Sequence, residues 1–367
     1  MRTLIILALF VRLSLSFLPA LRIDMASWQG WSQRMAEVGP AGFYSPEVFT
    51  AYPPTYLYIL WIFGLLQNHS DFLLKLPANL ADLAAGYLVY LIIKKRQGEK
   101  PGRLGFLLYV FNPAIWFNSA VFGQLDGIGA LFGLLAFYFL WERKNLTTAA
   151  ATFTLAWTIK PQAISLAPAL GLIALSRFKP REWLKAAAVF SGLTLLLYWP
   201  FFPANPLGGV ITVFKMMNNL YTCTTCFAFN FWGIWGNWQE DKFLWLGIIL
   251  FSAVLAVIFW RRKTNPYWQL ALTVLAFNQL MTRMHERYML PFFVFTLAAV
   301  LQLKSKKLFA GYFLFSLLNF LNVFYVYAYY NTGLRLTPWL ITWLNLHFRL
   351  MSLLSFGAFA ILLGIKP

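Results

Sequence analysis

The chain is poor in charged residues, cysteine and histidine, and each shortage excludes a class of protein. Only 11% of its 367 residues are charged, against about 25% in soluble domains, so polar side chains cannot cover a water-facing surface of this size. Two cysteines make no disulfide scaffold, and three scattered histidines make no zinc site. Glycine-rich nucleotide loops are absent as well. What remains is 60% hydrophobic, which indicates that most of the chain lies in a membrane.

The hydrophobic residues form runs that predict an all-α, polytopic membrane protein with about twelve transmembrane helices. A helix needs about 20 apolar residues to cross the hydrocarbon core of a bilayer. The candidate spans lie at 3–20, 72–93, 104–121, 125–141, 146–159, 163–176, 184–200, 243–260, 267–282, 289–303, 308–330 and 343–365. An even number of crossings places both termini on the same side of the membrane.

The basic residues predict which side that is. The net charge is +18, and the cytoplasmic connections of membrane proteins collect Lys and Arg. If both termini are cytoplasmic, most basic residues fall at the termini and in the short inner connections 94–103, 142–145, 177–185, 261–263 and 304–307. The long connections then fall outside, at 21–71, 201–242, 283–288 and 331–342. We therefore expect the chemistry on the non-cytoplasmic face.

Two segments decide the number of crossings. If the apolar run 52–67 crossed, the basic connection 94–103 would lie outside, so we expect 52–67 to lie along the membrane interface. If 146–176 crossed once, the basic segment 177–185 would be exported. We therefore expect two short arms whose tip, at 160–162, lies at the floor of an outward-facing cavity.

Ionisable side chains beside or within the spans mark candidate functional positions. Asp24 directly follows the first span and could take a proton from an acceptor arriving from outside, although a loop aspartate is often only solvated or a helix cap. Its neighbours Arg22 and Trp31 lie at headgroup depth, where tryptophan is commonly an anchor. Asp82 and Lys160 lie at membrane depth, which indicates either function or a structural ion pair.

Two further polar clusters fall at the outer ends of spans. Gln124 and Asp126 belong to a tight turn, which could be either part of a site or a polar loop tip. The second cluster contains Arg283, His285, Glu286, Arg287 and Tyr288. Because guanidinium groups match phosphate oxygens, this cluster predicts an anion site, with a collar facing lipid headgroups as the alternative.

One pair of cysteines, Cys223 and Cys226, has the spacing of a redox motif. No thioredoxin-like pattern surrounds the pair. On an oxidising side of the membrane the two residues could form a local disulfide.

Taken in order, these residues resemble the motifs of the GT-C superfamily of glycosyltransferases. The resemblance is to the asparagine-linked glycosylation glucosyltransferases that use dolichyl-phosphate-glucose, and to bacterial polyprenyl-phosphate-sugar mannosyltransferase relatives. The matching fragments are Asp24 with Trp31, Tyr52 of a Tyr-Pro-Pro segment, Asp82, Gln124, Lys160 before a Leu-Ala-Pro stretch, Asn230 and Trp232 of an Asn-Phe-Trp loop, and His285-Glu286-Arg287. The family carries a second acid where this chain has Met25-Ala26, and a lysine where it has Arg287.

The resemblance implies an inverting transfer of a hexose, glucose or mannose, from a polyprenyl-phosphate donor to a lipid-linked or other extracytoplasmic acceptor. Asp24 would be the general base, because an acceptor hydroxyl must lose its proton. The donor phosphate and sugar would contact Lys160, Arg283, His285 and Arg287, whose cations stabilise the leaving phosphate. Supporting residues would be Arg22, Trp31, Tyr52, Asp82, Gln124, Asp126, Gln162, Asn230, Trp232 and Glu286. No cofactor is required, although Asp24 and Asp126 could meet around a divalent metal.

We expect one integral membrane domain over 1–367. Its family-like catalytic module is 1–200, with external loop 21–71, and its variable helical module is 201–367, with external loop 201–242. In a bacterium it would lie in the plasma (inner) membrane with its site facing outward, and nucleic acid is not an expected partner. Two other functions stay open, namely a transporter or flippase of an anionic lipid or polyprenyl phosphate, and a non-catalytic scaffold subunit.

Overall fold

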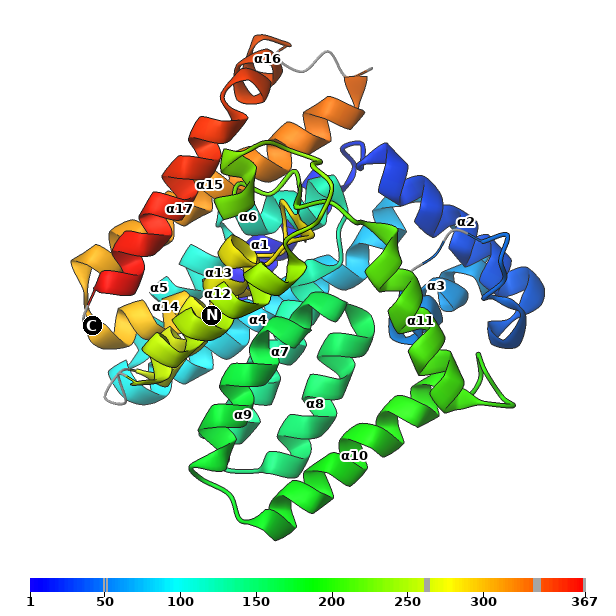
Figure 1. Cartoon of the computed structure of the whole chain (residues 1–367), viewed down its shortest axis with the longest axis horizontal. Coiled ribbons are helices and arrows are strands. Elements are labelled where there is room, and N and C mark those ends of the chain that lie inside the picture. The colour runs from blue at the N-terminus through cyan, green and yellow to red at the C-terminus, as the bar shows by residue number, and fades with distance from the viewer. Residues whose placement is uncertain (49, 51, 261–264, 333–337, 366–367) are drawn as a thin grey trace.

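The computed structural model describes residues 1–48, 50, 52–260, 265–332 and 338–365. This part of the chain is built almost entirely of helices, which confirms the expected all-α class (Figure 1). The exception is a parallel pair of two-residue strands, β1 (Thr225–Cys226) and β2 (Met284–His285). The expected inner connection 261–263 and residues 333–337 of the expected outer connection 331–342 lie outside the described residues.

Prolines set the starts of many helices, because a proline at the first helical position loses no hydrogen bond and has a suitable φ. The first ten helices are α1 (Arg2–Ser16), α2 (Arg22–Val38), α3 (Pro54–Leu65), α4 (Asp71–Gln97), α5 (Glu99–Val110), α6 (Pro113–Trp116), α7 (Asp126–Trp141), α8 (Leu146–Ile159), α9 (Ala167–Leu175) and α10 (Pro180–Tyr198). They are followed by α11 (Pro206–Leu220), α12 (Leu244–Trp260), α13 (Pro266–Leu280), α14 (Pro291–Leu303), α15 (Lys306–Tyr330), α16 (Pro338–Leu346) and α17 (Phe348–Gly364). Single turns of 3₁₀-helix or short π-helix cover Pro40–Gly42, Phe117–Phe122, Pro161–Leu166 and Phe231–Ile234.

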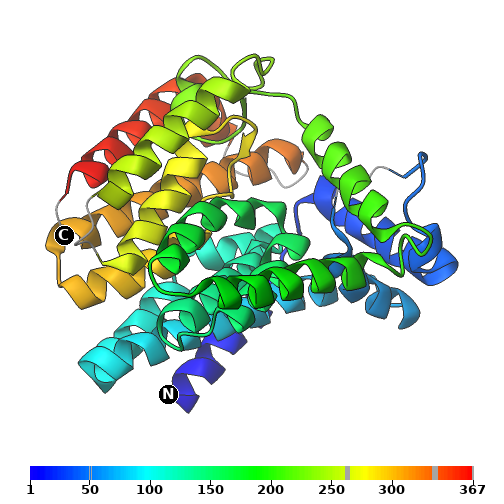
Figure 2. The same ribbon diagram turned by 60° about the horizontal axis from the view of Figure 1, so that its bottom comes forward.

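Helices α2 and α3 pack together at one side of the bundle, and α11 lies on the same side in both ribbon views (Figures 1 and 2). Gly64 permits this approach, since a Cβ atom there would collide with the carbonyl oxygen of Ser32. Helix α3 has 12 residues, so it is about 18 Å long, well short of the hydrocarbon core of about 30 Å. Its length therefore suits the interfacial position expected of 52–67.

The segment 146–176 doubles back on itself. Helix α8 ends at Ile159, and Lys160 with Pro161 forms the break before the 3₁₀ turn and α9. Residues from the start of α8, such as Leu146 and Ala149, line a common cavity with Ala174 near the end of α9. The tip of this hairpin is therefore at Lys160.

Each of the predicted spans overlaps a helix, but the lengths of the helices are uneven. By length and hydropathy, two described helices could each cross a membrane, α4 and α15. Two bent pairs could each form another span: α5 with Pro113–Phe122, bent by 46°, and α16 with α17, bent by 67°. The other apolar helices are shorter, so the full set of crossings and the cytoplasmic termini stay predictions.

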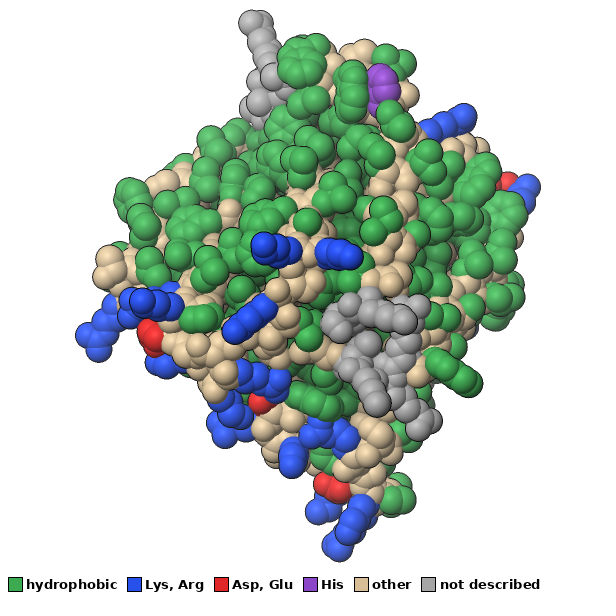
Figure 3. Space-filling view, turned by 90° about the vertical axis from the view of Figure 1, so that its left-hand side faces the viewer, with side chains coloured by type: hydrophobic (Ala, Val, Ile, Leu, Met, Phe, Trp, Pro, Cys, Tyr) green, Lys and Arg blue, Asp and Glu red, His purple; other side chains and the backbone are tan. Residues whose placement is uncertain are grey.

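The outer surface of the bundle carries many large apolar side chains. Trp260 is 88% exposed, Trp245 is 76% exposed and Leu184 is 73% exposed. The face in Figure 3 is mostly hydrophobic, with Lys and Arg side chains gathered toward one end of it. A soluble monomer rarely exposes so much contiguous apolar surface. This surface is typical of an integral membrane protein.

A buried ion pair joins the first helix to the fourth. Arg12 Nη1 lies 2.9 Å from Asp82 Oδ2, and both side chains are 1% exposed. Arg12 also donates to Ser119 Oγ at 2.9 Å and to the carbonyl oxygen of Val110 at 3.0 Å. The contacts of Arg12 link α1, α4 and the π-helical segment. Asp82 therefore takes part in a structural ion pair, which was one of the two interpretations that the sequence allowed.

Candidate functional site

A cavity of about 290 Å³ lies between α2, the tip of the α8–α9 hairpin, α11 and the loop after α13. Its wall is rich in aromatic side chains: Trp28, Trp31, Tyr52, Trp157, Phe214, Tyr221, Phe277 and Tyr288. Asp24, Gln162, Arg283, His285 and Arg287 also line it. The cavity thus collects residues that are far apart in the sequence, and several are the predicted site residues.

Asp24 reaches the cavity because the chain turns sharply between α1 and α2. The N–H of Leu21 donates to the carbonyl oxygen of Phe122 at 3.0 Å. The side chain of Asn331 accepts from the N–H of Arg22 and donates to the carbonyl oxygen of Ala20. These contacts fix the start of α2, where Asp24 occupies the first turn and suits the positive end of the helix dipole. Its side chain is 31% exposed.

Gln124 connects Asp24 to the interior of the protein. The π-helical segment Phe117–Phe122 ends at Gly123, whose φ of +92° favours glycine. The N–H groups of Gly123 and Gln124 both donate to the carbonyl oxygen of Asn118. This turn directs the Gln124 side chain so that Nε2 donates to Asp24 Oδ2 and Oε1 accepts from Lys160 Nζ at 3.2 Å.

Lys160 is brought to the same point by the break in the α8–α9 hairpin. Pro161 cannot continue α8, so Lys160 takes an extended conformation at its end. Its Nζ atom lies 3.3 Å from Asp126 Oδ1 and 3.3 Å from the hydroxyl of Tyr52. Because Lys160 is 3% exposed and Asp126 4% exposed, the two form a buried ion pair.

The loop between α13 and α14 supplies the second cation. Arg287 Nη2 lies 3.8 Å from Asp24 Oδ2, and its Nε lies 3.8 Å from Asp126 Oδ2. Its Nη1 donates to Glu286, which also lies 3.7 Å from His285 Nδ1. Burial acts to raise the pKa of Glu286, but Arg287 and His285 outweigh it and lower that pKa to about 2. Burial lowers the pKa of His285, so its ring is neutral at pH 7.

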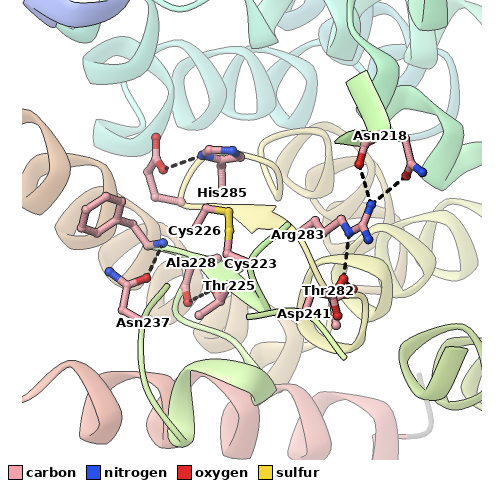
Figure 4. Close-up of a disulfide and its surroundings, with 12 residues drawn as sticks. Asn218, Cys223, Thr225, Cys226, Ala228, Asn237, Asp241, Thr282, Arg283 and His285 are labelled. Carbon is pink, nitrogen blue, oxygen red and sulfur yellow. Dashed lines mark hydrogen bonds and ion pairs between the residues drawn. A yellow bond between two sulfur atoms is a disulfide. The ribbon is translucent and has the colours of Figure 1, made fainter. Parts of the chain in front are cut away.

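A disulfide lies next to the loop between α13 and α14. Cys223 and Cys226 are bonded, and β1 pairs with β2 so that Cys226 lies opposite His285 (Figure 4). Arg283, which has a positive φ, directs its guanidinium to Asp241 at 2.7 Å and to the carbonyl oxygen of Asn218 at 2.6 Å. Arg283 lines the cavity, but its charge is already paired.

Charge is nearly balanced where these elements meet. Asp24, Asp126 and Glu286 contribute three carboxylates, and Lys160 and Arg287 contribute two cations. Only Asp24 among the three acids is substantially exposed to the cavity. No group of three or more His, Cys, Asp or Glu side chains that could hold a metal ion is found among the described residues.

Several predicted site residues lie elsewhere or have structural contacts. Asp82 does not line the cavity, and Arg22 is exposed and pairs with Asp71 at 3.4 Å. Asn230 caps the turn Phe231–Ile234 by accepting from the N–H of Gly233 at 3.1 Å. Trp232 Nε1 donates to the carbonyl oxygen of Leu280 at 2.8 Å. Asn230 and Trp232 thus stabilise the position of the loop around residues 230–234.

Sequence reasoning missed some residues of the cavity and of the contact network beside it. Tyr221 packs edge-on against His285, with ring centroids 4.7 Å apart, and no local pattern marks it. Asn118 Nδ2 lies 3.4 Å from Asp126 Oδ2, within donating distance. Trp157 lines the cavity and precedes Lys160 by about one helical turn, so its proximity in sequence was a usable signal.

Residues 51–204 match the family model of dolichyl-phosphate-mannose-protein mannosyltransferases. The chain therefore resembles a GT-C glycosyltransferase, as its motifs predicted. The matched segment contains Tyr52, Gln124, Asp126, Lys160 and Gln162. The description of that family names a dolichyl-phosphate-linked sugar as the donor. No curated protein is significantly similar in sequence to the chain.

Proposed function

We propose that this protein is an inverting glycosyltransferase that moves a hexose, glucose or mannose, from a polyprenyl-phosphate donor to a lipid-linked or other extracytoplasmic acceptor. The observation that carries the proposal is a contact network of Asp24, Gln124, Lys160 and Arg287, of which Asp24 and Arg287 line one aromatic-walled cavity. One accessible carboxylate lies beside two buried cations, which is the arrangement that acid–base transfer from a phosphate leaving group requires.

Asp24 is the base in this mechanism. The amide of Gln124 donates to one of its oxygens and holds the carboxylate at the cavity. Asp126 and Glu286 are 4% and 1% exposed and are paired with buried cations, so an acceptor hydroxyl cannot reach them. The acceptor oxygen loses its proton to Asp24, bonds to the anomeric carbon, and the bond from that carbon to the phosphate oxygen breaks. A single displacement of this kind inverts the configuration.

Arg287, which lines the cavity, receives the phosphate that leaves, and Lys160, on the other oxygen of Asp126, adds positive charge nearby. The distances from Arg287 to Asp24 and to Asp126 are long, at 3.8 Å each, so a phosphate oxygen could replace one of these carboxylates. The charge on the departing polyprenyl phosphate grows as the bond breaks, and fixed cations in a buried site stabilise that change. The step uses no cofactor.

The aromatic walls suit a hexose. Trp28, Trp31, Tyr52 and Tyr221 line the cavity around Asp24, and such rings offer flat apolar faces with polar edges. Gln162 and His285 add hydrogen-bonding groups to the lining of the cavity. We propose that the sugar lies between these walls, with its phosphate toward Arg287.

The disulfide supports an outward-facing site. Disulfides persist in oxidising compartments, and the bond between Cys223 and Cys226 lies beside His285. The orientation proposed here places the loop 201–242 outside. In a bacterium the protein would then act at the outer face of the inner membrane.

The test uses the purified full chain with labelled polyprenyl-phosphate-mannose and polyprenyl-phosphate-glucose and an extracted membrane lipid fraction. Appearance of label on a new lipid, with release of polyprenyl phosphate, is the expected result. If liposomes containing the protein instead move the donor across the bilayer without transferring the sugar, the transporter alternative is correct and the enzyme proposal fails.

A further inference from the structure

A second cavity lies at the other end of the bundle. It has a volume of about 680 Å³ and is bounded by the end of α4, the start of α5, the end of α14 and the start of α15. Helix α14 begins after the loop that carries Arg287 and has 13 residues, so this second cavity is about 20 Å from the candidate site. It belongs to a different part of the molecule.

The floor and walls of this cavity are apolar. They are formed by Leu104, Val300, Leu301, Phe309, Ala310 and Phe313. Leu104 and Phe313 are 43% and 49% exposed, so the cavity opens sideways onto the hydrophobic surface of the bundle. Gly105 lets α5 pack closely, because a Cβ atom there would lie 2.5 Å from Ile93 Cδ1 of α4 and 3.2 Å from Leu301 Cδ1 of α14. The groove between α5 and α14 therefore faces the hydrocarbon of a bilayer.

Three lysines stand at the polar end of the groove. Lys100, Lys304 and Lys306 line it, and none of them forms an ion pair with a described residue. The neighbouring basic residues differ, since Lys94 and Arg103 pair with Glu99, and Arg96 pairs with Glu142. Lys306 is also the first residue of the 25-residue helix α15, whose dipole adds positive potential there.

We propose that this groove binds an anionic phospholipid, with one acyl chain along α5, α14 and α15 and the headgroup phosphate at Lys100, Lys304 and Lys306. The apolar walls match the chain, and the unpaired charges match the headgroup. Basic pockets between membrane helices bind anionic headgroups in this way. The site is independent of the sugar-transfer proposal, because none of its residues takes part in that reaction.

The experiment measures lipid retained by the purified full chain, by native mass spectrometry after incubation with phosphatidylglycerol or phosphatidylcholine. The wild-type protein should retain one phosphatidylglycerol and much less phosphatidylcholine. The triple variant K100Q/K304Q/K306Q should bind phosphatidylglycerol about tenfold to a hundredfold more weakly, since each basic residue near an anionic surface contributes about a fivefold effect. A matched triple variant of exposed basic residues outside the groove, K144Q/R181Q/K185Q, should bind as the wild type does.

A second variant tests the acyl chain without changing charge. Ala310→Phe fills the groove and should also abolish retention, whereas Ala188→Phe, at another exposed helix position, should not. Melting temperatures in detergent without added lipid verify that every variant is folded. Equal retention of both lipids, or equal losses in the two triple variants, would overturn the proposal.

Discussion

Asp24→Asn is the substitution that most directly tests the mechanism. Asparagine keeps the size of the side chain and can still accept the hydrogen bond from Gln124. It cannot take a proton from an acceptor hydroxyl. The change also removes the attraction between the Asp24 carboxylate and the guanidinium of Arg287, which lie 3.8 Å apart. The substitution therefore removes the base and leaves the surroundings of the cavity almost intact.

The structure sets different magnitudes for activity and stability. Loss of a general base typically lowers the rate by about 10²–10⁴-fold, so kcat for sugar transfer should fall by that factor. Asp24 is 31% exposed, and partly solvated ion pairs contribute about 0–1 kcal/mol to stability. The melting temperature should consequently change by only a few degrees, and the binding of donor should be nearly unchanged.

The assay follows transfer of label from the donor, with donor binding measured separately. Asp71→Asn is the matched control, because Asp71 is another acid in the first turn of a helix, away from the cavity. Asp126→Asn is a poor control. The sequence allowed it to be a turn former, but the structure buries it 3.3 Å from Lys160, so its loss should disturb the site. A fully active Asp24→Asn enzyme would refute the assignment of the base and with it the proposed mechanism.

The site and the topology give four further predictions. Arg287→Ala should lower kcat/KM by about 10²-fold, measured beside the surface variant Arg181→Ala; equal losses in the two variants would indicate a folding defect. Single cysteines at Gly98 and Arg181 should be shielded from an external impermeant thiol reagent in intact cells, and one at Glu47 should react. Burial lowers the pKa of His285 in the folded protein, so as the pH falls the His285 ring is protonated in the unfolded chain before it is protonated in the folded one. Acidification below about pH 6.5 therefore favours unfolding, and it should lower the melting temperature of the wild type more than that of His285→Gln. Treatment with a chelator should leave transfer unchanged, and loss of transfer restored by a divalent cation would contradict the cofactor-free step.

The positions of the helices could be read from the sequence, whereas their lengths could not. Hydrophobic runs and prolines mark where helices begin, as at Pro266 and Pro291. Run length does not show where a helix bends, and the break before Pro113 divides one predicted span into two pieces. The two-residue strands could not be predicted either, because their pairing joins Cys226 to His285, which are 59 positions apart in the sequence.

The residues that the structure brings together around Asp24 could be named from the sequence, but their connections could not. Asp24, Gln124, Lys160 and Arg287 could each be named from polarity at an unusual depth and from motif order. The bridge through Gln124 joins residues separated by 100 positions, so only the fold shows it. Arg12 was overlooked because one charge within an apolar run does not change its hydropathy enough to stand out. Its partner Asp82 then looked like a site residue.

The distribution of buried charge favours a reaction at one face over passage through the protein. The network around Arg287 gathers at the ends of α2, α7 and α8, and Glu142 pairs with Arg96 at the opposite end of the bundle. Between the two ends lies the pair of Arg12 and Asp82, about 16 Å along α4 from its first residue. A polar path that ran between α1 and α4 at this depth would separate that pair, and leaving one charge of a buried pair without its partner costs about 3–5 kcal/mol. A transporter that used this path would meet the cost in each cycle, whereas an enzyme with its donor and acceptor on the same side can leave the pair closed.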